Sequence, residues 1–317
     1  MGSETSSTKY FTLATFLLIP ISIYFPSAFL WIKPYVQLGI AIIILGAGIT
    51  LTFAEFKNVW HNKRLLFLAL VLQYTIMPFL AYALSKIGHL GPTMMIGMIL
   101  TGASPGGVTS NIMTLLCRGN LPLSISATFL STLISPLVTP LIVFLTLHKT
   151  IEIELIPMMK TTCIMLLLPL FLGIVIKSIF KDRIKKVETG LPILSLVVTL
   201  LILGYIGASN RDLFLKGSFG ILPFVALHNL LGLFLGYMVA KYFTKDRANQ
   251  RTVALEVGMQ NTALAMVLAI KFFNISAAFP AALFSLWHNI IGINLSRYWS
   301  SFIEKKSETS TRPVIND

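Results

Sequence analysis

Charged residues are scarce in this chain of 317 residues, because Asp, Glu, Lys and Arg together make up only 12% of it. A soluble globular protein carries about 25% of these residues. With 55% of its residues hydrophobic, a soluble protein of this length could not cover its surface with polar groups. The same apolar content excludes an intrinsically disordered chain. A polytopic membrane protein is the class that fits.

Cysteine is scarce, and basic residues outnumber acidic ones. Both facts bear on which functions are possible. The two cysteines, Cys117 and Cys163, are too few and too isolated for a disulfide framework or a thiolate metal site. The formal net charge of +13 invites a nucleic-acid interpretation. However, the Lys and Arg residues fall mostly between apolar stretches, where basic residues flank membrane spans. We therefore expect a lipid bilayer around the chain and no nucleic acid as a partner.

Ten apolar stretches are long enough to cross a membrane as helices, which takes about 20 residues each. The first is longer than the apolar core of a signal peptide and contains two prolines, so we interpret it as a span. The sequence therefore predicts an all-α polytopic membrane protein with ten transmembrane helices. The stretches cover residues 11–32, 36–53, 65–84, 93–116, 121–147, 155–179, 191–208, 219–243, 253–273 and 277–299.

The basic residues are distributed unevenly over the two sets of loops. If the N-terminus is cytoplasmic, 18 of the 25 Lys and Arg residues lie in cytoplasmic segments. Cytoplasmic loops of membrane proteins carry such an excess. We therefore predict a multi-pass protein with both termini in the cytoplasm. Its length and the lack of a transit-peptide composition favour a bacterial inner membrane.

The fourth span of each half is interrupted by helix-weakening residues. Ten spans divide into five plus five, and an odd number per half gives the halves opposite orientations, as in an inverted repeat. In the first half, Pro105 removes a backbone donor, and Gly106 and Gly107 add freedom. In the second half, residues 256–261 (EVGMQN) interrupt an apolar run around Gly258. Paired interruptions indicate a transporter site, although two packing kinks would give the same pattern.

Glu256 is the one acidic residue within an apolar stretch, and it lies in the second interruption. An acid at the centre of a membrane helix costs about 2.5–3.5 kcal/mol, so a proton, a basic partner or a bound cation must offset it. No Lys or Arg is near mid-membrane, which leaves His228 and His288 as possible basic partners. One carboxylate with neutral oxygens suits a hard monovalent ion such as sodium. The neutral donors, each of which could instead bond a neighbouring helix, are Gln73, Ser110, Asn111, Ser124, Thr128, Gln260 and Asn261.

Five segments carry a recognisable pattern, and the Pro-Gly-Gly to Ser-Asn run and the EVGMQN run are the most specific. The segments are 46–56 (GAGITLTFAEF), 102–116 (GASPGGVTSNIMTLL), 123–140 (LSISATFLSTLISPLVTP), 256–264 (EVGMQNTAL) and 280–289 (PAALFSLWHN). Together they resemble the bile acid:sodium symporter family, including its bacterial members, over nearly the whole chain. The resemblance implies a symporter that uses the sodium gradient to import an organic anion, bile-acid-like or a smaller carboxylate, by alternating access.

The resemblance also implies an architecture. The ten helices would form a 5+5 inverted repeat in which the broken spans four and nine cross. A panel domain would consist of about residues 11–53 and 155–208, and a core domain of about residues 65–147 and 219–299. Residues 300–317 would form a cytoplasmic tail.

The resemblance finally implies two sodium ions behind the crossing, and no organic cofactor is expected. The first sodium site would use Ser110, Asn111, Ser124, Thr128 and Glu256. The second would use Gln73, Glu256, Val257, Met259 and Gln260, with Val257 and Met259 contributing backbone carbonyls. The substrate cavity would be faced by Thr109, Asn111, Asn261, His288 and Asn289. The helix breaks would lie at Pro105, Gly106, Gly107 and Gly258.

Three competing functions predict different features. A proton-coupled anion transporter of the same fold, with Glu256 titrating, would not need so many neutral oxygen donors. An intramembrane enzyme would need a catalytic motif, and His228 and His288 lie in no HExxH or GxSxG context. A receptor would need a signalling domain, for which the short loops leave no room. We therefore expect a transporter and not an enzyme, with its oligomeric state left open.

Overall fold

The computed structural model describes residues 17–18, 20–50, 63–148, 151–215 and 218–310. This part of the chain consists of helices joined by short connections, and it contains no β-strand, only one isolated β-bridge. The predicted all-α class is confirmed for these residues. The start of the first predicted span, Glu55 with its surrounding loop, and the end of the tail lie outside the described residues.

Six helices run without interruption over most of a predicted span. They are α3 (Val36–Thr50), α5 (Lys63–Ile87), α8 (Leu121–Leu147), α11 (Lys185–Ser209), α13 (Leu222–Phe243) and α16 (Phe279–Ser310). Three further spans are interrupted. The fourth span consists of α6 (Pro92–Ala103) and α7 (Thr109–Leu116), and the ninth consists of α14 (Arg247–Gly258) and α15 (Thr262–Phe272). The sixth span consists of α9 (Leu155–Thr162), η3 (Cys163–Leu167) and α10 (Leu168–Phe180). The short elements are α2 (Ser27–Leu30), η1 (Lys33–Tyr35), η4 (Lys181–Ile184), α12 (Arg211–Leu215), η5 (Ser218–Ile221) and η6 (Ile275–Ala278).

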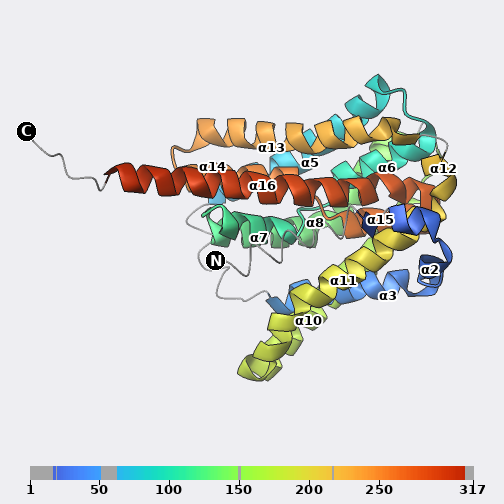
Figure 1. Cartoon of the computed structure of the whole chain (residues 1–317), viewed down its shortest axis with the longest axis horizontal. Helices are drawn as coiled ribbons and strands as arrows, with labels where there is room; N and C mark the ends of the chain where they lie inside the picture. Colours follow the sequence, from blue (N-terminus) through green and yellow to red (C-terminus); the bar gives the residue numbers. More distant parts are fainter. Residues whose placement is uncertain (1–16, 19, 51–62, 149–150, 216–217, 311–317) are drawn as a thin grey trace, which may run out of the picture.

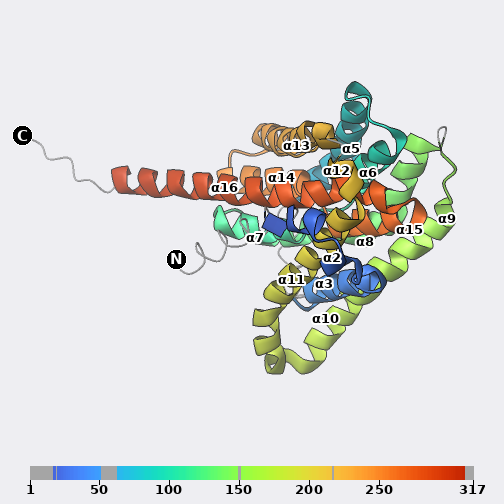
Figure 2. The same cartoon turned by 45° about the vertical axis from the view of Figure 1, so that its right-hand side comes forward.

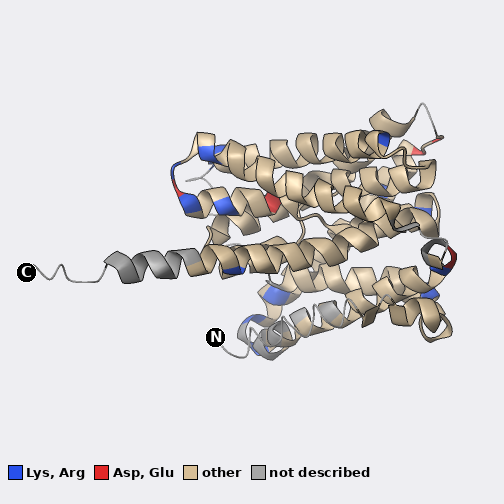
Figure 3. Ribbon diagram, turned by 45° about the horizontal axis from the view of Figure 1, so that its top comes forward, with Lys and Arg blue, Asp and Glu red and all other residues tan. Residues whose placement is uncertain are grey.

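Among the described residues, six helical segments are long and apolar enough to cross a membrane. Their charged residues gather toward the two ends of the bundle (Figure 3). The helices of the two broken spans are shorter, and each pair would have to cross the membrane together. The ten-span 5+5 repeat therefore stays a prediction. The six segments are Ser27–Ile49, Lys63–Ile87, Leu121–Leu147, Leu155–Phe180, Leu222–Phe243 and Ile275–Ser301.

The helices pack as two groups (Figures 1 and 2). In the smaller group, α3 lies against α10 and α11. A Cβ on Gly48 of α3 would lie 2.2 Å from the carbonyl oxygen of Leu170, and a Cβ on Gly173 of α10 would lie 2.4 Å from that of Leu45. Only glycine permits such an approach, so these two helices are locked against each other at this point.

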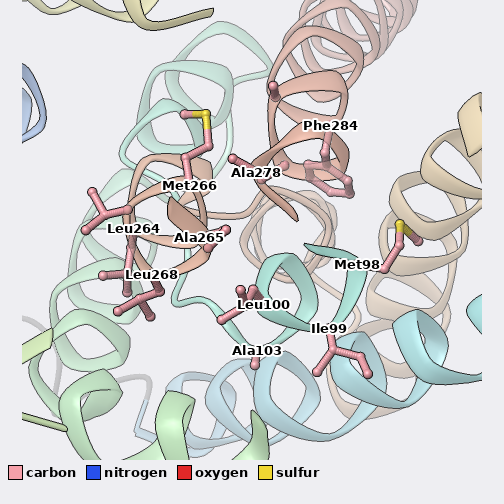
Figure 4. Packing of buried hydrophobic residues seen from close by; sticks show 14 of the residues in the cluster. Met98, Ile99, Leu100, Ala103, Leu264, Ala265, Met266, Leu268, Ala278 and Phe284 are labelled. Carbon is pink, nitrogen blue, oxygen red and sulfur yellow. The ribbon is translucent and has the colours of Figure 1, made fainter. Parts of the chain in front are cut away.

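In the larger group, α6 lies in the centre and packs against α5, α8, α15 and α16. Met98, Ile99 and Leu100 of α6 are almost fully buried. Leu100 lies toward Ala265 of α15, and Met98 lies on the other side of α6 (Figure 4). Gly97 allows the closest contact, because a Cβ there would lie 2.2 Å from the Ala277 carbonyl oxygen. This dry cluster supports the first broken span from behind.

Three features of the helices differ from the sequence-based expectation. Helix α14 begins at Arg247, before the predicted start at residue 253, because contacts with the turn before α8 bury its polar first turns. Helix α16 continues to Ser310, past the predicted end at residue 299. The sixth span contains a π-helical turn, η3. Pro169 follows it and has no N–H for the Met165 carbonyl, so the regular helical bond cannot form there.

Candidate functional site

Both interruptions are real breaks in helical structure. Residues 104–108 separate α6 from α7, so Pro105, Gly106 and Gly107 lie in the first break as predicted. Residues 259–261 separate α14 from α15. Gly258 is the last residue of α14, and Glu256 is helical. The second break is thus shorter than the predicted interruption and begins after Gly258.

The two breaks cross in direct backbone contact. Gly106 and Gln260 form an antiparallel bridge. The Gly107 N–H donates to the Met259 carbonyl at 2.9 Å, and the Asn261 N–H donates to the Pro105 carbonyl at 2.8 Å. Backbone that leaves a helix at membrane depth must find such partners, because no lipid can provide them. The two breaks therefore satisfy part of each other's backbone polar groups.

The Glu256 carboxylate lies directly behind this crossing and is only 4% exposed. Its Oε1 accepts hydrogen bonds from Ser110 of α7 and Ser124 of α8, both at 2.5 Å. Its Oε2 accepts from Thr128 of α8 at 2.9 Å. No Lys or Arg of the described chain pairs with it. The His228 ring bonds the Met77 carbonyl instead, so hydroxyl groups, and not a histidine, surround the acid.

Asn111 completes the first predicted sodium set. Its Oδ1 accepts from Ser124 at 2.8 Å and from Thr128 at 3.4 Å. Ser124 and Thr128 are one turn apart on α8 and therefore share a face. All five residues predicted for the first site thus lie within one connected cluster. If the hydroxyl protons turn outward, the cluster offers a carboxylate and four neutral oxygens, which suits a hard cation.

The second predicted set is also contiguous. Gln73 of α5 donates to the Ser104 carbonyl at 2.7 Å and to Gln260 Oε1 at 2.5 Å. Gln260 in turn donates to the Val257 carbonyl at 3.0 Å. The Oε1 of Gln73 is buried and has no hydrogen-bond partner. A buried acceptor needs a partner. Because no N–H or O–H group of the described residues donates to this oxygen, a bound cation would supply that partner.

A small pocket of about 10 Å³ lies beside Glu256, lined by residues that include Gln73, Gly106 and Ser131. A space of about 10–15 Å³ is what one water molecule needs. Room for one small ion therefore exists beside the Glu256 side chain.

A cavity of about 130 Å³ lies on the other side of the crossing, between the two helix groups. One wall is polar and contains all five predicted substrate residues, Thr109, Asn111, Asn261, His288 and Asn289. The opposite wall is mostly apolar, with Ile43 and Ile44 of α3, Leu166 and Leu170 beside the π-helical turn, and Ile202 of α11. Among the described residues, no charged side chain lines the cavity.

The sequence missed several polar residues of this cavity. Ser285 lines it and lies one turn before His288 and Asn289 on α16. This spacing was a usable signal, because residues three and four apart share a helix face. Thr132 and Thr199 also line the cavity, and they lie in apolar spans without any interruption that would single them out.

The second half-helix of each broken span starts at the cavity. Helix α7 has no side-chain N-cap, whereas the Asn261 side chain accepts from the Leu264 N–H at the start of α15. The amide end of a helix carries a positive partial charge that favours an anion. Two such ends beside an uncharged cavity can attract an anion without any Lys or Arg.

The sequence profile of the Sodium Bile acid symporter family matches residues 37–217, which is more than half of the chain. The chain belongs to this family. The uncharacterized sodium-dependent transporter YocS of Bacillus subtilis (strain 168) is 35% identical over 286 residues, covering 90% of this chain and 89% of its own.

Two further relatives show how widely the similarity extends. The probable sodium/metabolite cotransporter BASS1, chloroplastic, of Arabidopsis thaliana is 34% identical over 286 residues, covering 89% of this chain and 71% of its own. The hepatic sodium/bile acid cotransporter of Rattus norvegicus is 28% identical over 244 residues, covering 74% and 67%. Membership makes this chain a multi-pass membrane transporter of the sodium symport type, not an enzyme.

Thr128→Val tests the first oxygen cluster in this family member. Valine keeps the shape of threonine and removes one oxygen that contacts Glu256. We expect sodium to stabilise the purified protein only at about tenfold higher concentration, as the loss of roughly 1.4 kcal/mol of binding free energy implies. The measurement is the melting temperature against sodium, with potassium keeping the ionic strength constant.

Thr146→Val on the same helix is the matched control, because its hydroxyl bonds only carbonyls of α8. Its sodium response should equal that of the unmodified chain. An unchanged response of Thr128→Val would remove Thr128 from the ion site.

Proposed function

We propose that this protein imports an organic anion together with two sodium ions by alternating access. The observation that carries the proposal is the buried Glu256 carboxylate. It lies among neutral oxygens at the crossing of two broken helices, and a cavity adjoins the same crossing. A proton or an ion must offset its charge. The two oxygen sets that meet at Glu256 support one ion each.

The ions would couple to the substrate through the crossing. Sodium in the first set would hold α7 through Ser110 and Asn111, and sodium in the second set would hold the break after α14. Asn111 belongs to the first set and also lines the cavity. Ion binding would therefore fix the cavity wall that receives the anion. Two sodium ions with one monovalent anion move one net charge, worth about 2.3 kcal/mol per 100 mV.

The cavity supports a small carboxylate over a bile acid as the substrate. A site for a drug-sized ligand is about 300–1,000 Å³, and this cavity is about 130 Å³. Thr109, Asn261, His288 and Asn289 would bond the polar groups of the anion, together with the amide ends of α7 and α15. The apolar wall, with Ile43 and Leu170, would cover its hydrocarbon part.

The two helix groups would be the moving parts. The first span, α3, α9 to α10 and α11 would form the panel, and the remaining long helices would form the core, within a ten-helix inverted repeat. The glycine contact of α3 with α10 supports a stiff panel. The cavity lies between the groups, so a relative rotation would open it to one side of the membrane and then to the other.

A thermal-shift screen of small organic anions on purified protein tests the function. We expect one or more short-chain carboxylates to raise the melting temperature in sodium and not in potassium. At a ligand concentration 100 times the Kd, stabilisation is about 2.7 kcal/mol. Anions that stabilise equally in both salts would contradict sodium coupling.

The same anions in proteoliposomes distinguish sodium from proton coupling. We expect an inward sodium gradient to drive uptake at equal pH on both sides. Uptake that follows a pH gradient in sodium-free buffer would instead establish the proton-coupled alternative, with Glu256 as the proton carrier.

A further inference from the structure

Gly258 is the last residue of α14, and its carbonyl has no hydrogen-bond donor within its own span. In an uninterrupted helix it would accept from the N–H of Thr262, but that N–H donates to the Gln260 carbonyl at 2.9 Å. The side-chain amide of Asn229, on α13, donates to the Gly258 carbonyl at 2.8 Å. Asn229 is completely buried. A side chain of a neighbouring helix thus satisfies one of the carbonyls that the second break releases.

The first break has the same arrangement. The amide of Gln73, on α5, donates to the carbonyl of Ser104, the residue that caps α6. Helix α5 directly precedes the first broken span, and α13 directly precedes the second. The two bonds join residues separated by 31 and 29 positions. In both cases a buried amide, one helix earlier, reaches the carbonyl at which a helix ends.

Close packing of α13 against α14 lets the Asn229 side chain reach the Gly258 carbonyl. A Cβ on Gly232 would lie 3.3 Å from the Cα of Gly258, and a Cβ on Gly236 would lie 3.1 Å from the Cα of Ala254. Asn229, Gly232 and Gly236 are spaced by three and four residues, so they form one face of α13. This face brings α13 within the length of an asparagine side chain from the break. The neighbouring His228 bonds the Met77 carbonyl of α5.

The amide bond fixes the backbone that supplies the second ion site. Gly258 lies between Val257 and Met259, whose carbonyls belong to that site, and two residues after Glu256. A peptide plane that rotates at Gly258 also turns the carbonyls beside it. The Oδ1 of Asn229 has no hydrogen-bond partner, so the side chain is held in place through its amide nitrogen.

From this geometry we infer that Asn229 is a positioning residue for the cation site, the counterpart in α13 of Gln73 in α5. The inference rests on the proposed sodium coupling. Asn229 contacts neither the cavity nor the carboxylate. It acts on ion affinity by holding the Gly258 peptide in the orientation that the break requires.

Asn229→Ala tests this role, with Asn210→Ala as the matched control. Asn210 is also buried, donates to one carbonyl, that of Ile206 in its own helix, and has an unpartnered Oδ1. Melting temperatures of the full-length chains are titrated with sodium chloride against potassium chloride at constant ionic strength, without any organic anion. We expect Asn229→Ala to need about tenfold more sodium for half-maximal stabilisation, and Asn210→Ala to need the same as the unmodified chain. Asn229→Ser, which leaves less empty space, replaces the alanine variant if that one does not fold.

The outcomes separate the two proposals. If sodium stabilises the unmodified chain, and Asn229→Ala melts lower in potassium but keeps its sodium midpoint, the residue is only structural and the inference is wrong. An equal midpoint shift in Asn210→Ala would also overturn it, because a general loss of packing would then be the cause. If sodium does not stabilise the unmodified chain, the proposed function fails, and the role of Asn229 fails with it.

Discussion

Glu256→Gln is expected to abolish the stabilisation of this transporter by sodium and its sodium-driven uptake. Glutamine keeps the size of the side chain but replaces a charged oxygen with an NH₂ group, which cannot bind a cation. Both proposed sodium sets include this carboxylate, so both lose their only formal charge. Bonds to charged groups contribute about 1.5–3 kcal/mol each. The combined loss corresponds to a sodium affinity lower by at least about a hundredfold.

The control for this prediction is Glu152→Gln, which removes one acid from an exposed segment before α9. Its melting temperature should depend on sodium as in the unmodified chain. The Glu256 variant should melt at the same temperature in sodium and in potassium. A Glu256→Gln chain that still responds fully to sodium would end the proposal that this acid binds the coupling ion.

Gly107→Ala is expected to disrupt the crossing of the two broken helices. A Cβ at Gly107 would lie 2.7 Å from the carbonyl oxygen of Gln260 and 3.0 Å from its carbonyl carbon. Both atoms belong to the backbone, so the second break would have to move away. Overpacking of this kind costs about 1–3 kcal/mol. The shift would separate Gln260 from Gln73, so we also expect sodium stabilisation to weaken by at least about tenfold.

Gly220→Ala controls for the added methyl group, because no atom lies within 4 Å of a Cβ at that position. It should change neither the melting temperature nor the sodium midpoint measurably. If Gly107→Ala behaves like Gly220→Ala, the two breaks do not cross as tightly as the contacts indicate.

Elements with a strong local signal could be predicted from the sequence. The predicted span 121–147 has the bounds of α8, because its apolar run ends sharply at polar residues. Pro105 and the two glycines after it located the first break, since these residues cannot continue a helix easily. Glu256 pointed to the site because an acid in an apolar span requires compensation.

Features that depend on contacts between distant segments could not be predicted. The first turns of α14 read as a cytoplasmic loop, yet Asn249 and Thr252 are buried by bonds to the backbone and side chain of Asn120. Asn229 reads as one more polar residue in an apolar helix. Its partner, the Gly258 carbonyl, is available only because the second break ends α14 there. A sequence does not show which backbone carbonyls are left without a helical partner.

The backbone bridge at the crossing also bears on leakage. The Gly107 and Asn261 amides join the two broken spans through backbone hydrogen bonds. In the proposed symport cycle, an ion that crossed at this point without substrate would have to break these amide–carbonyl hydrogen bonds, which are worth about 4–6 kcal/mol each where water is absent. The bridge would then slow uncoupled sodium flow.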